Sequence, residues 1–208
     1  TYLSVVETFF SSSNPFEQGT PGRSLSASTA VIRPAQSKDL SDLADILTDS
    51  FHPPAGIVRW VSPLLRLGIY EDLRNRLRST APNYACLVAV DAPARNPDAY
   101  DCLIGTIEVT LRTNYLWQPR QTYHPYLSNL AIRAEYRRRG VALQLLTACE
   151  RIVLDWGFQD IYLHVLENNH AAKRLYFKAG YRLQQTELDW SCWLLGRPRK
   201  LFLHKRLT

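Results

Sequence analysis

The sequence lacks long apolar runs and cysteine pairs at metal-binding spacing. No apolar run approaches the roughly 18 residues that a membrane-spanning helix requires, although 46% of the chain is hydrophobic. Its four cysteines, Cys86, Cys102, Cys149 and Cys192, form no spacing typical of metal ligands. Two of them fall in apolar stretches that predict core elements. We therefore expect reduced thiols in an intracellular protein, no transmembrane segment and no metal site.

Acidic residues are fewer than basic ones, but the basic residues do not cluster in one part of the sequence. Lysine and arginine total 25 against 19 aspartates and glutamates, which gives a net charge of +6. The basic residues are spread from Arg33 to Arg206 without a basic helix or interleaved stacking aromatics, so nucleic-acid binding is not expected. The charge suits a smaller acidic partner instead.

The length of 208 residues favours one domain with one sizeable core, and no internal repeat is visible. We expect a flexible leader over residues 1–29, which is rich in serine and has little hydrophobic periodicity, followed by a single domain over residues 30–208. A transit peptide would also be serine-rich, but it would avoid acids, whereas the leader has Glu7 and Glu17 against one arginine, Arg23.

The first half of the domain predicts strand, helix, helix, strand, strand. Residues 31–34 form a short strand, and Ser37 is expected to cap an amphipathic helix that ends at the prolines after Phe51. A second helix is expected over residues 56–79, with Pro63 as a kink or break and an apolar face made of Trp60, Leu64, Leu67, Tyr70, Leu73 and Leu77. Residues 84–90 and 103–111 predict a hairpin with a long loop, and residues 112–124 a polar loop.

The stretch from residue 125 to 181 predicts a β-α-β-α unit. A strand over 126–132 leads to a helix that Gly157 ends as a left-handed cap, and a strand over 161–166 leads to a helix that ends at Gly180. A strand, a helix and a strand in so few residues imply a parallel pair with a right-handed connection. Strands over about 182–188 and 200–205 complete the order β-α-α-β-β-β-α-β-α-β-β.

The turn over residues 137–142 is the expected ligand site of this unit. Ligands of parallel units lie beyond the carboxyl ends of the strands, and the start of a helix there presents free N–H groups and a partial positive charge. Gly140 lets the backbone approach a phosphate closely, and Ala142 keeps the first helical turn thin. The turn therefore predicts an anion site built chiefly from backbone N–H groups.

These motifs resemble those of the GNAT N-acetyltransferase superfamily. Arg137-x-x-Gly140-x-Ala142 after a Leu-Ala-Ile strand is similar to its acetyl-CoA pyrophosphate loop, and the run from Asn169 to Tyr181 is similar to its next motif. The family often has glycine where Ala142 stands. The resemblance implies an α/β fold with a mixed, splayed sheet of about seven strands flanked by four helices. It implies acetyl-CoA as cofactor, with CoA as product, bound by Leu130, Ala131, Ile132, Arg137, Arg138, Arg139, Gly140, Val141, Ala142, Asn169 and Tyr176.

Three residues are candidates for the proton transfers. Alternation places Tyr126 on one face of the first parallel strand, with Ser128, Leu130 and Ile132, and His164 on one face of the second, with Tyr162 and Leu166. If these two faces look into the same cleft, Tyr126 and His164 meet. In the protein N-terminal acetyltransferases that this pattern resembles, such a pair takes the amine proton through a water. Tyr176 would then protonate the departing thiolate, and Asn169 would cap its helix. Glu108, Glu167 and water remain the competing bases, although either glutamate is also expected to be solvated or structural.

The acceptor is expected to be a primary amine that attacks directly. No Ser-His-Asp arrangement and no recognisable cysteine nucleophile supports an acyl-enzyme. Deprotonation at pH 7 costs about 4.6 kcal/mol for a lysine and about 1 kcal/mol for an α-amine. We therefore expect protein or peptide α-amines as substrates, with lysine side chains as a further possibility. The Tyr-Leu-Ser-Asn-Leu-Ala run also resembles the plastid and cyanobacterial group, in which both activities occur.

Two other functions stay open at this stage. The first is acetylation of a small amine, either an arylalkylamine or a polyamine, although no acidic cluster favours a polyamine. The second is a non-catalytic module that binds CoA or a protein partner. The segment 51–57 is the expected acceptor-specificity loop, and the stable partners and the oligomeric state are undetermined. We expect the protein in the cytoplasm, or in the plastid stroma if the chain comes from a plant or an alga.

Overall fold

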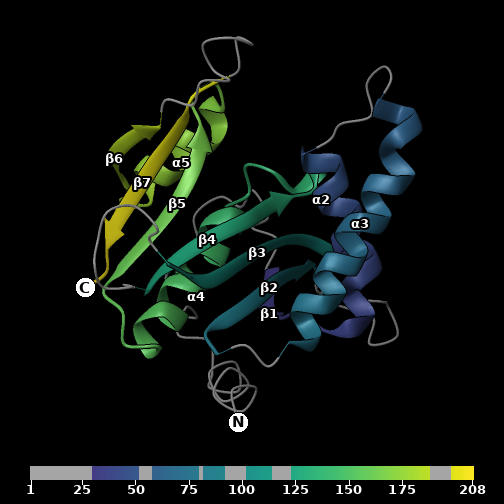
Figure 1. Ribbon diagram of the computed structural model, residues 1–208, viewed down its shortest axis with the longest axis horizontal. Coiled ribbons are helices and arrows are strands. Elements are labelled where there is room, and N and C mark those ends of the chain that lie inside the picture. Colours follow the sequence, from purple (N-terminus) through teal and green to yellow (C-terminus); the bar gives the residue numbers. More distant parts are fainter. Residues whose placement is uncertain (1–29, 52–57, 80–81, 92–101, 114–122, 188–197) are drawn as a thin grey trace, which may run out of the picture. The chain divides into compact units, whose positions relative to one another are not determined.

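The computed structural model describes residues 30–51, 58–79, 82–91, 102–113, 123–187 and 198–208. The described elements follow the expected order and form seven strands and four α-helices (Figure 1). The strands are β1 (Ala30–Pro34), β2 (Tyr84–Asp91), β3 (Cys102–Thr113), β4 (Tyr123–Ile132), β5 (Asp160–Leu166), β6 (Arg182–Glu187) and β7 (Lys200–Arg206). The α-helices are α2 (Leu40–Phe51), α3 (Val58–Arg78), α4 (Val141–Asp155) and α5 (His170–Lys178), joined by the short 3₁₀ turns η1 (Ser37–Asp39) and η2 (Ala134–Tyr136).

The strands form one mixed sheet in the order β1-β2-β3-β4-β5-β7-β6. The expected parallel pair is confirmed, because β4 and β5 run parallel and pair at Tyr126 and Tyr162. In contrast, β5 and β7 pair antiparallel along the full length of β5. The short parallel pairing agrees with the expected splay. No helix among the described residues is long and apolar enough to cross a membrane.

The described residues divide into two compact units. Of the described residues, the first comprises 30–51, 58–79, 82, 86–91, 102–106 and 131–141, and the second comprises 83–85, 107–113, 123–130, 142–187 and 198–208. Several sequence expectations lie outside the described residues: the leader, the specificity loop after Phe51, the long hairpin loop, most of the polar loop before β4, and the segment with Cys192.

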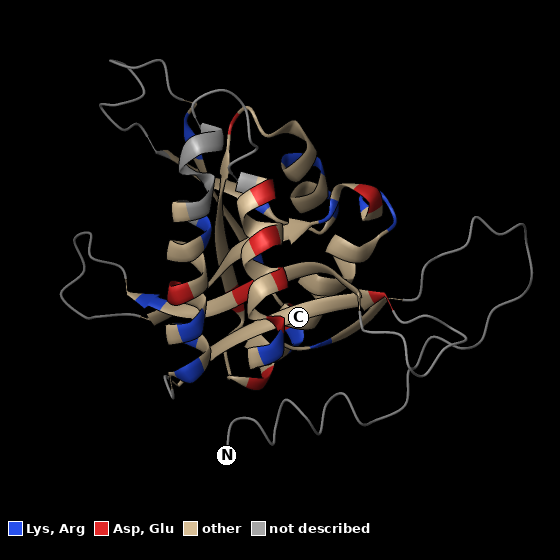
Figure 2. Cartoon of the chain, turned by 90° about the vertical axis from the view of Figure 1, so that its right-hand side faces the viewer, with Lys and Arg blue, Asp and Glu red and all other residues tan. Residues whose placement is uncertain are grey.

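The first unit packs α2 and α3 side by side and pairs β1 with β2 (Figure 1). Its most buried large side chains are Leu43, Ile46, Leu73, Leu87, Leu103 and Ile104. Acidic and basic residues both mark the outer sides of the helices (Figure 2). Arg76 pairs with Asp72 one turn earlier at 2.6 Å, and Arg66 of α3 pairs with Asp45 of α2. Burial of apolar area, rather than these exposed pairs, holds the unit together.

The start of the first helix differs from the expected serine cap. Ser37 is the first residue of η1, and α2 begins only at Leu40. Asp39 organises this corner, because its carboxylate accepts hydrogen bonds from the Gln36 backbone N–H at 2.7 Å and from Arg33 at 2.7 and 3.0 Å. The Asp39 carboxylate, rather than the Ser37 hydroxyl, accepts the backbone N–H at this corner, and it also neutralises the half-buried Arg33.

The expected apolar face of the second helix is wrong in part. Leu73 is buried, but Leu64 and Leu67 are 70% and 57% exposed. The helix also continues through Pro63 without a break. A proline near the first turns of a helix removes a single backbone hydrogen bond, and the remaining 15 residues after it are enough to sustain the helix.

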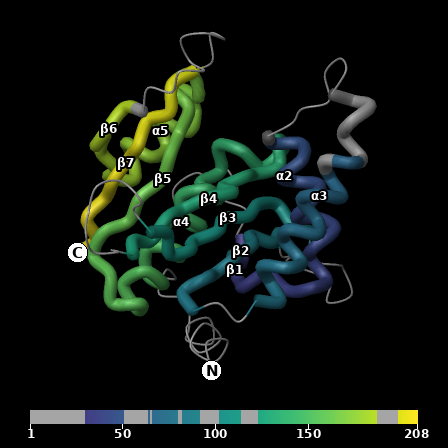
Figure 3. Tube along the Cα trace, viewed as in Figure 1, coloured from purple at the N-terminus to yellow at the C-terminus, as the bar shows by residue number. Residues whose placement is uncertain are grey.

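The second unit places β7 between β5 and β6 (Figures 1 and 3). Its fully buried side chains include Ile107, Leu145, Leu146, Ile161, Leu163 and Tyr181. Both expected glycine caps are confirmed. Gly157 and Gly180 have φ of 84° and 95°, and each helix ends with the paired backbone bonds of a Schellman motif.

Candidate active site

Tyr126 of β4 and His164 of β5 form a hydrogen-bonded pair. The Tyr126 hydroxyl lies 2.8 Å from His164 Nδ1, and the two ring centroids are 5.6 Å apart. The parallel register explains the contact: Tyr126 lies opposite Tyr162, two residues before His164 on the same face of β5. Tyr126 is buried and His164 is half-buried. The structure thus brings together the two residues that strand alternation predicted to meet.

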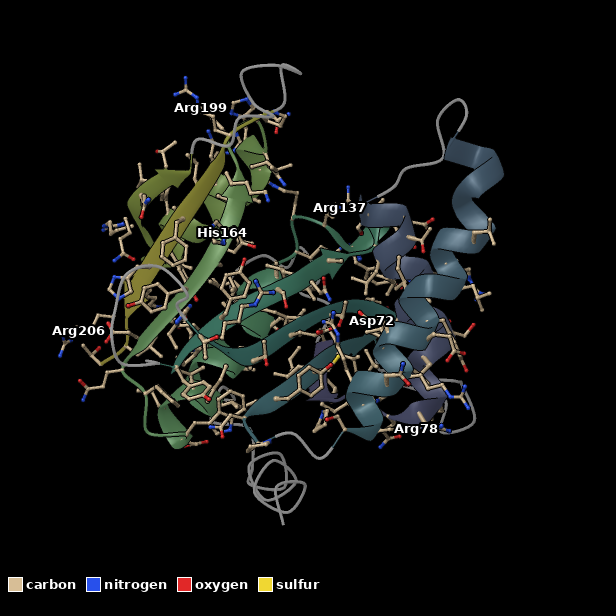
Figure 4. The ribbon with its side chains drawn as sticks, viewed as in Figure 1. Asp72, Arg78, Arg137, His164, Arg199 and Arg206 are labelled. Carbon is tan, nitrogen blue, oxygen red and sulfur yellow. The ribbon has the colours of Figure 1, made fainter. Side chains whose placement is uncertain are left out.

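An aromatic row continues from His164 along β5 and β7. His164 packs on Phe202 at 4.7 Å between ring centroids, and Tyr162 stacks on Phe202 and on His204 at 5.3 and 4.8 Å. His204 Nε2 lies 2.7 Å from the Asp160 carboxylate. Burial raises the pKa of the Tyr162 hydroxyl, with a smaller contribution from Asp160. The row fixes the plane of the His164 ring. Figure 4 shows His164 on β5.

Arg112 covers the ring of Tyr126, and sequence reasoning missed it. Its guanidinium carbon lies 3.6 Å from the centroid of the Tyr126 ring, well inside the range of a cation–π contact. Residue 112 was assigned to the polar loop, whereas β3 extends through Thr113. Alternation along an extended β3 would have placed Arg112 on the face of Glu108, which is the signal that could have found it.

Glu108 and Asn129 form a second contact between β3 and β4. The Asn129 side-chain amide donates to Glu108 Oε1 at 3.0 Å, and Glu108 is 1% exposed. Glu108 is therefore a buried, hydrogen-bonded group, which agrees with the structural one of the two expectations for it. Asn129 has a φ of 53° inside β4, so the two-residue alternation expected from Tyr126 to Ile132 is interrupted there. Glu167, the other candidate base, is exposed after the end of β5.

Tyr176 lies in α5 and is 9% exposed. Its ring meets that of Tyr181 edge-on at 5.8 Å. Burial raises the pKa of its hydroxyl, and Tyr126 contributes in the same direction, so this hydroxyl keeps its proton at neutral pH. Asn169 begins the same helix, and its side-chain oxygen accepts the Ala172 N–H at 3.1 Å. The expected cap is confirmed.

The turn over residues 137–142 follows β4 and η2. Arg137, labelled in Figure 4, donates from Nε to the Ile132 carbonyl at 3.0 Å, and Arg139 lies over the Tyr136 ring. The pKa of the Tyr136 hydroxyl is raised to about 12, chiefly by its hydrogen bond to Asp91. The strand residues before the turn, Leu130, Ala131 and Ile132, are half-buried or buried, and Val141 and Ala142 begin the helix with buried and half-buried side chains.

The turn suits an anionic phosphate group. Gly140 has a φ of 85°, and among the described residues no atom lies within 4 Å of the place where a Cβ on it would stand. Arg137, Arg138 and Arg139 are exposed. Free N–H groups at the start of the 15-residue helix α4 add a partial positive charge. The residues present thus fit the pyrophosphate of CoA.

The sequence profile of the acetyltransferase (GNAT) family matches residues 42–181. The chain therefore belongs to this family, whose members use acetyl-CoA. GCN5-related N-acetyltransferase 10, chloroplastic, of Arabidopsis thaliana is 28% identical over 168 residues, which are 78% of this chain and 66% of that relative. The chain thus spans just under two thirds of that relative's length.

Solved structures share the fold. The PaiA N-acetyltransferase of Thermoplasma acidophilum, in complex with coenzyme A, superposes with a TM-score of 0.62 at 21% identity over 86% of this chain and 99% of that one. NAA60 of Arabidopsis thaliana, in complex with acetyl-CoA, superposes with a TM-score of 0.61 at 19% identity over 86% and 98% of the two chains. At these identities the likeness establishes the fold.

Proposed function

We propose that this chain transfers acetyl from acetyl-CoA directly to a primary amine, with peptide and protein α-amines as the preferred acceptors and lysine side chains as secondary ones. The observation that carries the proposal is the hydrogen bond between Tyr126 and His164 in a chain of the acetyltransferase family. An imidazole is a side chain suited to accepting a proton in such a reaction.

The proposed cofactor contacts are those of the turn and its surroundings. Backbone N–H groups from Gly140 to Ala142 hold the pyrophosphate, and at least one of Arg137, Arg138 and Arg139 reaches a phosphate. Leu130 to Ile132 line the pantetheine arm, and Asn169 contacts it while capping α5. Charge-assisted bonds from backbone N–H groups and arginines are the strong kind in such sites.

The proposed reaction is a direct displacement. Through a water, His164 and Tyr126 accept a proton from the acceptor amine, and the amine nitrogen attacks the thioester carbonyl. The carbon–sulfur bond then breaks, and the electron pair leaves with the CoA sulfur. Tyr176, whose hydroxyl is protonated at neutral pH, donates its proton to that sulfur. No covalent enzyme intermediate is needed.

The preference for α-amines follows from the cost of deprotonation. The pKa of a lysine ammonium is near 10.4, about 3.4 units above pH 7, whereas the pKa of an α-ammonium is near 7.8, only about 0.8 units above it. One imidazole and one water suffice for the second. A small amine is the remaining alternative.

The compartment is also a proposal. The first relatives that the chain matches are named chloroplastic, which favours the plastid stroma over the cytoplasm.

Acetyl-CoA-dependent acetylation of a peptide library tests the proposal. The library contains free α-amines and lysines on separate peptides, with spermidine and an arylalkylamine as additional acceptors, and mass spectrometry locates the acetyl group. We expect α-amine products to form fastest. Faster acetylation of spermidine or the arylalkylamine would replace the proposal with the small-amine function, and CoA binding without any turnover would indicate a binding module.

A further inference from the structure

We propose that Arg112 determines acceptor choice, and that it selects α-amines followed by an acidic residue. The inference rests on the proposed function, because it concerns the acceptor side of the same reaction. It begins from the guanidinium that lies 3.6 Å from the centroid of the Tyr126 ring, whose hydroxyl bonds His164. A fixed positive charge therefore stands beside the pair that would take the amine proton.

The stacked geometry leaves the donors of Arg112 available. A guanidinium is planar, and its five N–H groups point outward within its plane. A guanidinium carbon only 3.6 Å from the ring centroid leaves no room for an N–H between it and the ring, so the contact with Tyr126 uses none of these donors. Arg112 is exposed near the end of β3, so its N–H groups face solvent or a bound acceptor. A fork of donors of this kind matches the two oxygens of a carboxylate.

Nothing in the described part of the chain neutralises this charge. Among the described residues no carboxylate forms an ion pair with Arg112. Glu108 is the carboxylate on the same face of β3, four residues earlier and roughly 13 Å away along the strand, but it is buried and accepts from Asn129. The ionisable groups of the described residues that are known to interact with Tyr126 include Arg112, His164 and Tyr176, and none of these three is a carboxylate.

This charge acts on the acceptor in two ways. It disfavours a protonated amine beside the pair, because like charges repel, and thus favours neutral α-amines over lysine-rich or polyamine acceptors. It also attracts a carboxylate one residue from the reacting amine, since adjacent residues are about 3.8 Å apart. Asp or Glu at the second position of the acceptor would meet the guanidinium while the amine meets the Tyr126–His164 pair.

The preference should be moderate in size. The guanidinium is exposed, and exposed ion pairs contribute little, whereas bidentate arginine–carboxylate pairs contribute more. We expect kcat/KM for an acidic second residue to exceed that for its amide by about tenfold at low salt. The ratio should fall as salt screens the charge.

Four peptides that differ only at the second residue test the inference: Asp, Asn, Leu and Lys. With the parent chain we expect the order Asp, then Asn and Leu, then Lys. Arg112→Gln should reduce the Asp-to-Asn ratio to about one, and Arg112→Glu should invert the Asp-to-Lys order. Arg112→Lys keeps the charge but not the planar fork, so it should retain part of the ratio.

The control variant is Arg206→Gln, which removes the same charge from an exposed arginine whose guanidinium bonds Gln159. It should leave the Asp-to-Asn ratio as in the parent. Thermal unfolding of each variant confirms that it is folded, and ratios within one variant cancel any general loss of activity. An unchanged ratio in folded Arg112→Gln overturns the inference.

Binding of desamino peptides, which lack the reacting amine, separates this inference from the proposed function. Calorimetry with CoA present should give about tenfold tighter binding of the Asp desamino peptide than of the Asn one, lost in Arg112→Gln. Turnover of α-amine peptides without any charge preference would refute the role of Arg112 and leave the function intact. Charge-selective binding without turnover would refute the function and leave the role of Arg112 intact.

Discussion

The Tyr126 hydroxyl and His164 Nδ1 lie 2.8 Å apart although 38 positions separate the two residues along the chain. A phenol and an imidazole in contact can exchange the donor and acceptor roles, which is the property that a proton relay requires. Phe202 packs on the His164 ring and Arg112 on the Tyr126 ring, and these contacts limit how far the two rings can turn. The pair is therefore held before a substrate arrives, and such preorganisation lowers the cost of the reaction.

Replacement of His164 by alanine should slow acetylation of an α-amine peptide by roughly 10² to 10⁴ in kcat/KM. Activity should recover in part at higher pH, because more of the amine is then neutral without help. Tyr126→Phe should cost less, because Tyr126 positions the water more than it accepts the proton. Initial rates from pH 6 to 9.5 on one peptide check both.

Glu108 gives the opposite pattern if it is the base. Glu108→Gln would then abolish turnover while His164→Ala would cost only a few-fold. We expect instead that Glu108→Gln retains most activity if it folds, because its amide can still accept from Asn129. A folded His164→Ala with near-parent rates would refute the assignment of His164.

Replacement of Gly140 by aspartate should weaken CoA binding strongly, because it places a negative charge at the proposed pyrophosphate site. Gly140→Ala is the matched control: both variants force a side chain onto a φ of 85°, but alanine adds no charge. Titration calorimetry with CoA should therefore give the order parent, alanine, aspartate. Equal affinities for folded aspartate variant and parent would show that the cofactor site lies elsewhere.

Tyr176→Phe should keep CoA affinity and lower kcat by at least about tenfold, since the ring still packs but the proton donor is gone. Its buried neighbour Tyr181 provides the control, because Tyr181→Phe also removes a buried hydroxyl. That variant should change stability without a comparable change in kcat. Stopped-flow measurement of thiol release follows the affected step. An unchanged kcat in Tyr176→Phe would leave water as the acid.

Asp39→Asn should lower the free energy of unfolding by about 1–3 kcal/mol at pH 7, because it leaves Arg33 half-buried without its charged partner. Burial alone would raise the pKa of Asp39, but hydrogen bonds from Arg33 and the Gln36 backbone hold it below the ordinary 3.8. A depressed pKa contributes stability above about pH 4, and that contribution is lost as the pH falls through the folded value. Urea unfolding at pH 7 and pH 3 should show the difference between parent and variant shrinking at the lower pH.

Local features of the fold were readable from the sequence because their causes are local. Gly157 and Gly180 end their helices through backbone bonds within six residues, and only glycine adopts such φ values readily. Asn169 caps α5 through a residue three positions away. The parallel pairing of β4 and β5 followed from the length of their connection, and strand alternation then predicted the meeting of Tyr126 and His164.

Features that depend on how separate segments pack were decided only by the tertiary structure. Leu64 and Leu67 have the periodicity of a buried helix face, yet both are exposed. Whether another segment covers them depends on residues outside the helix. Asn129 interrupts β4 while bonding Glu108, 21 positions earlier. Arg112 reaches Tyr126 because β3 and β4 are neighbours in the sheet. A slip of one residue between two strands would turn a side chain to the other face, so the contact depends on both strands together.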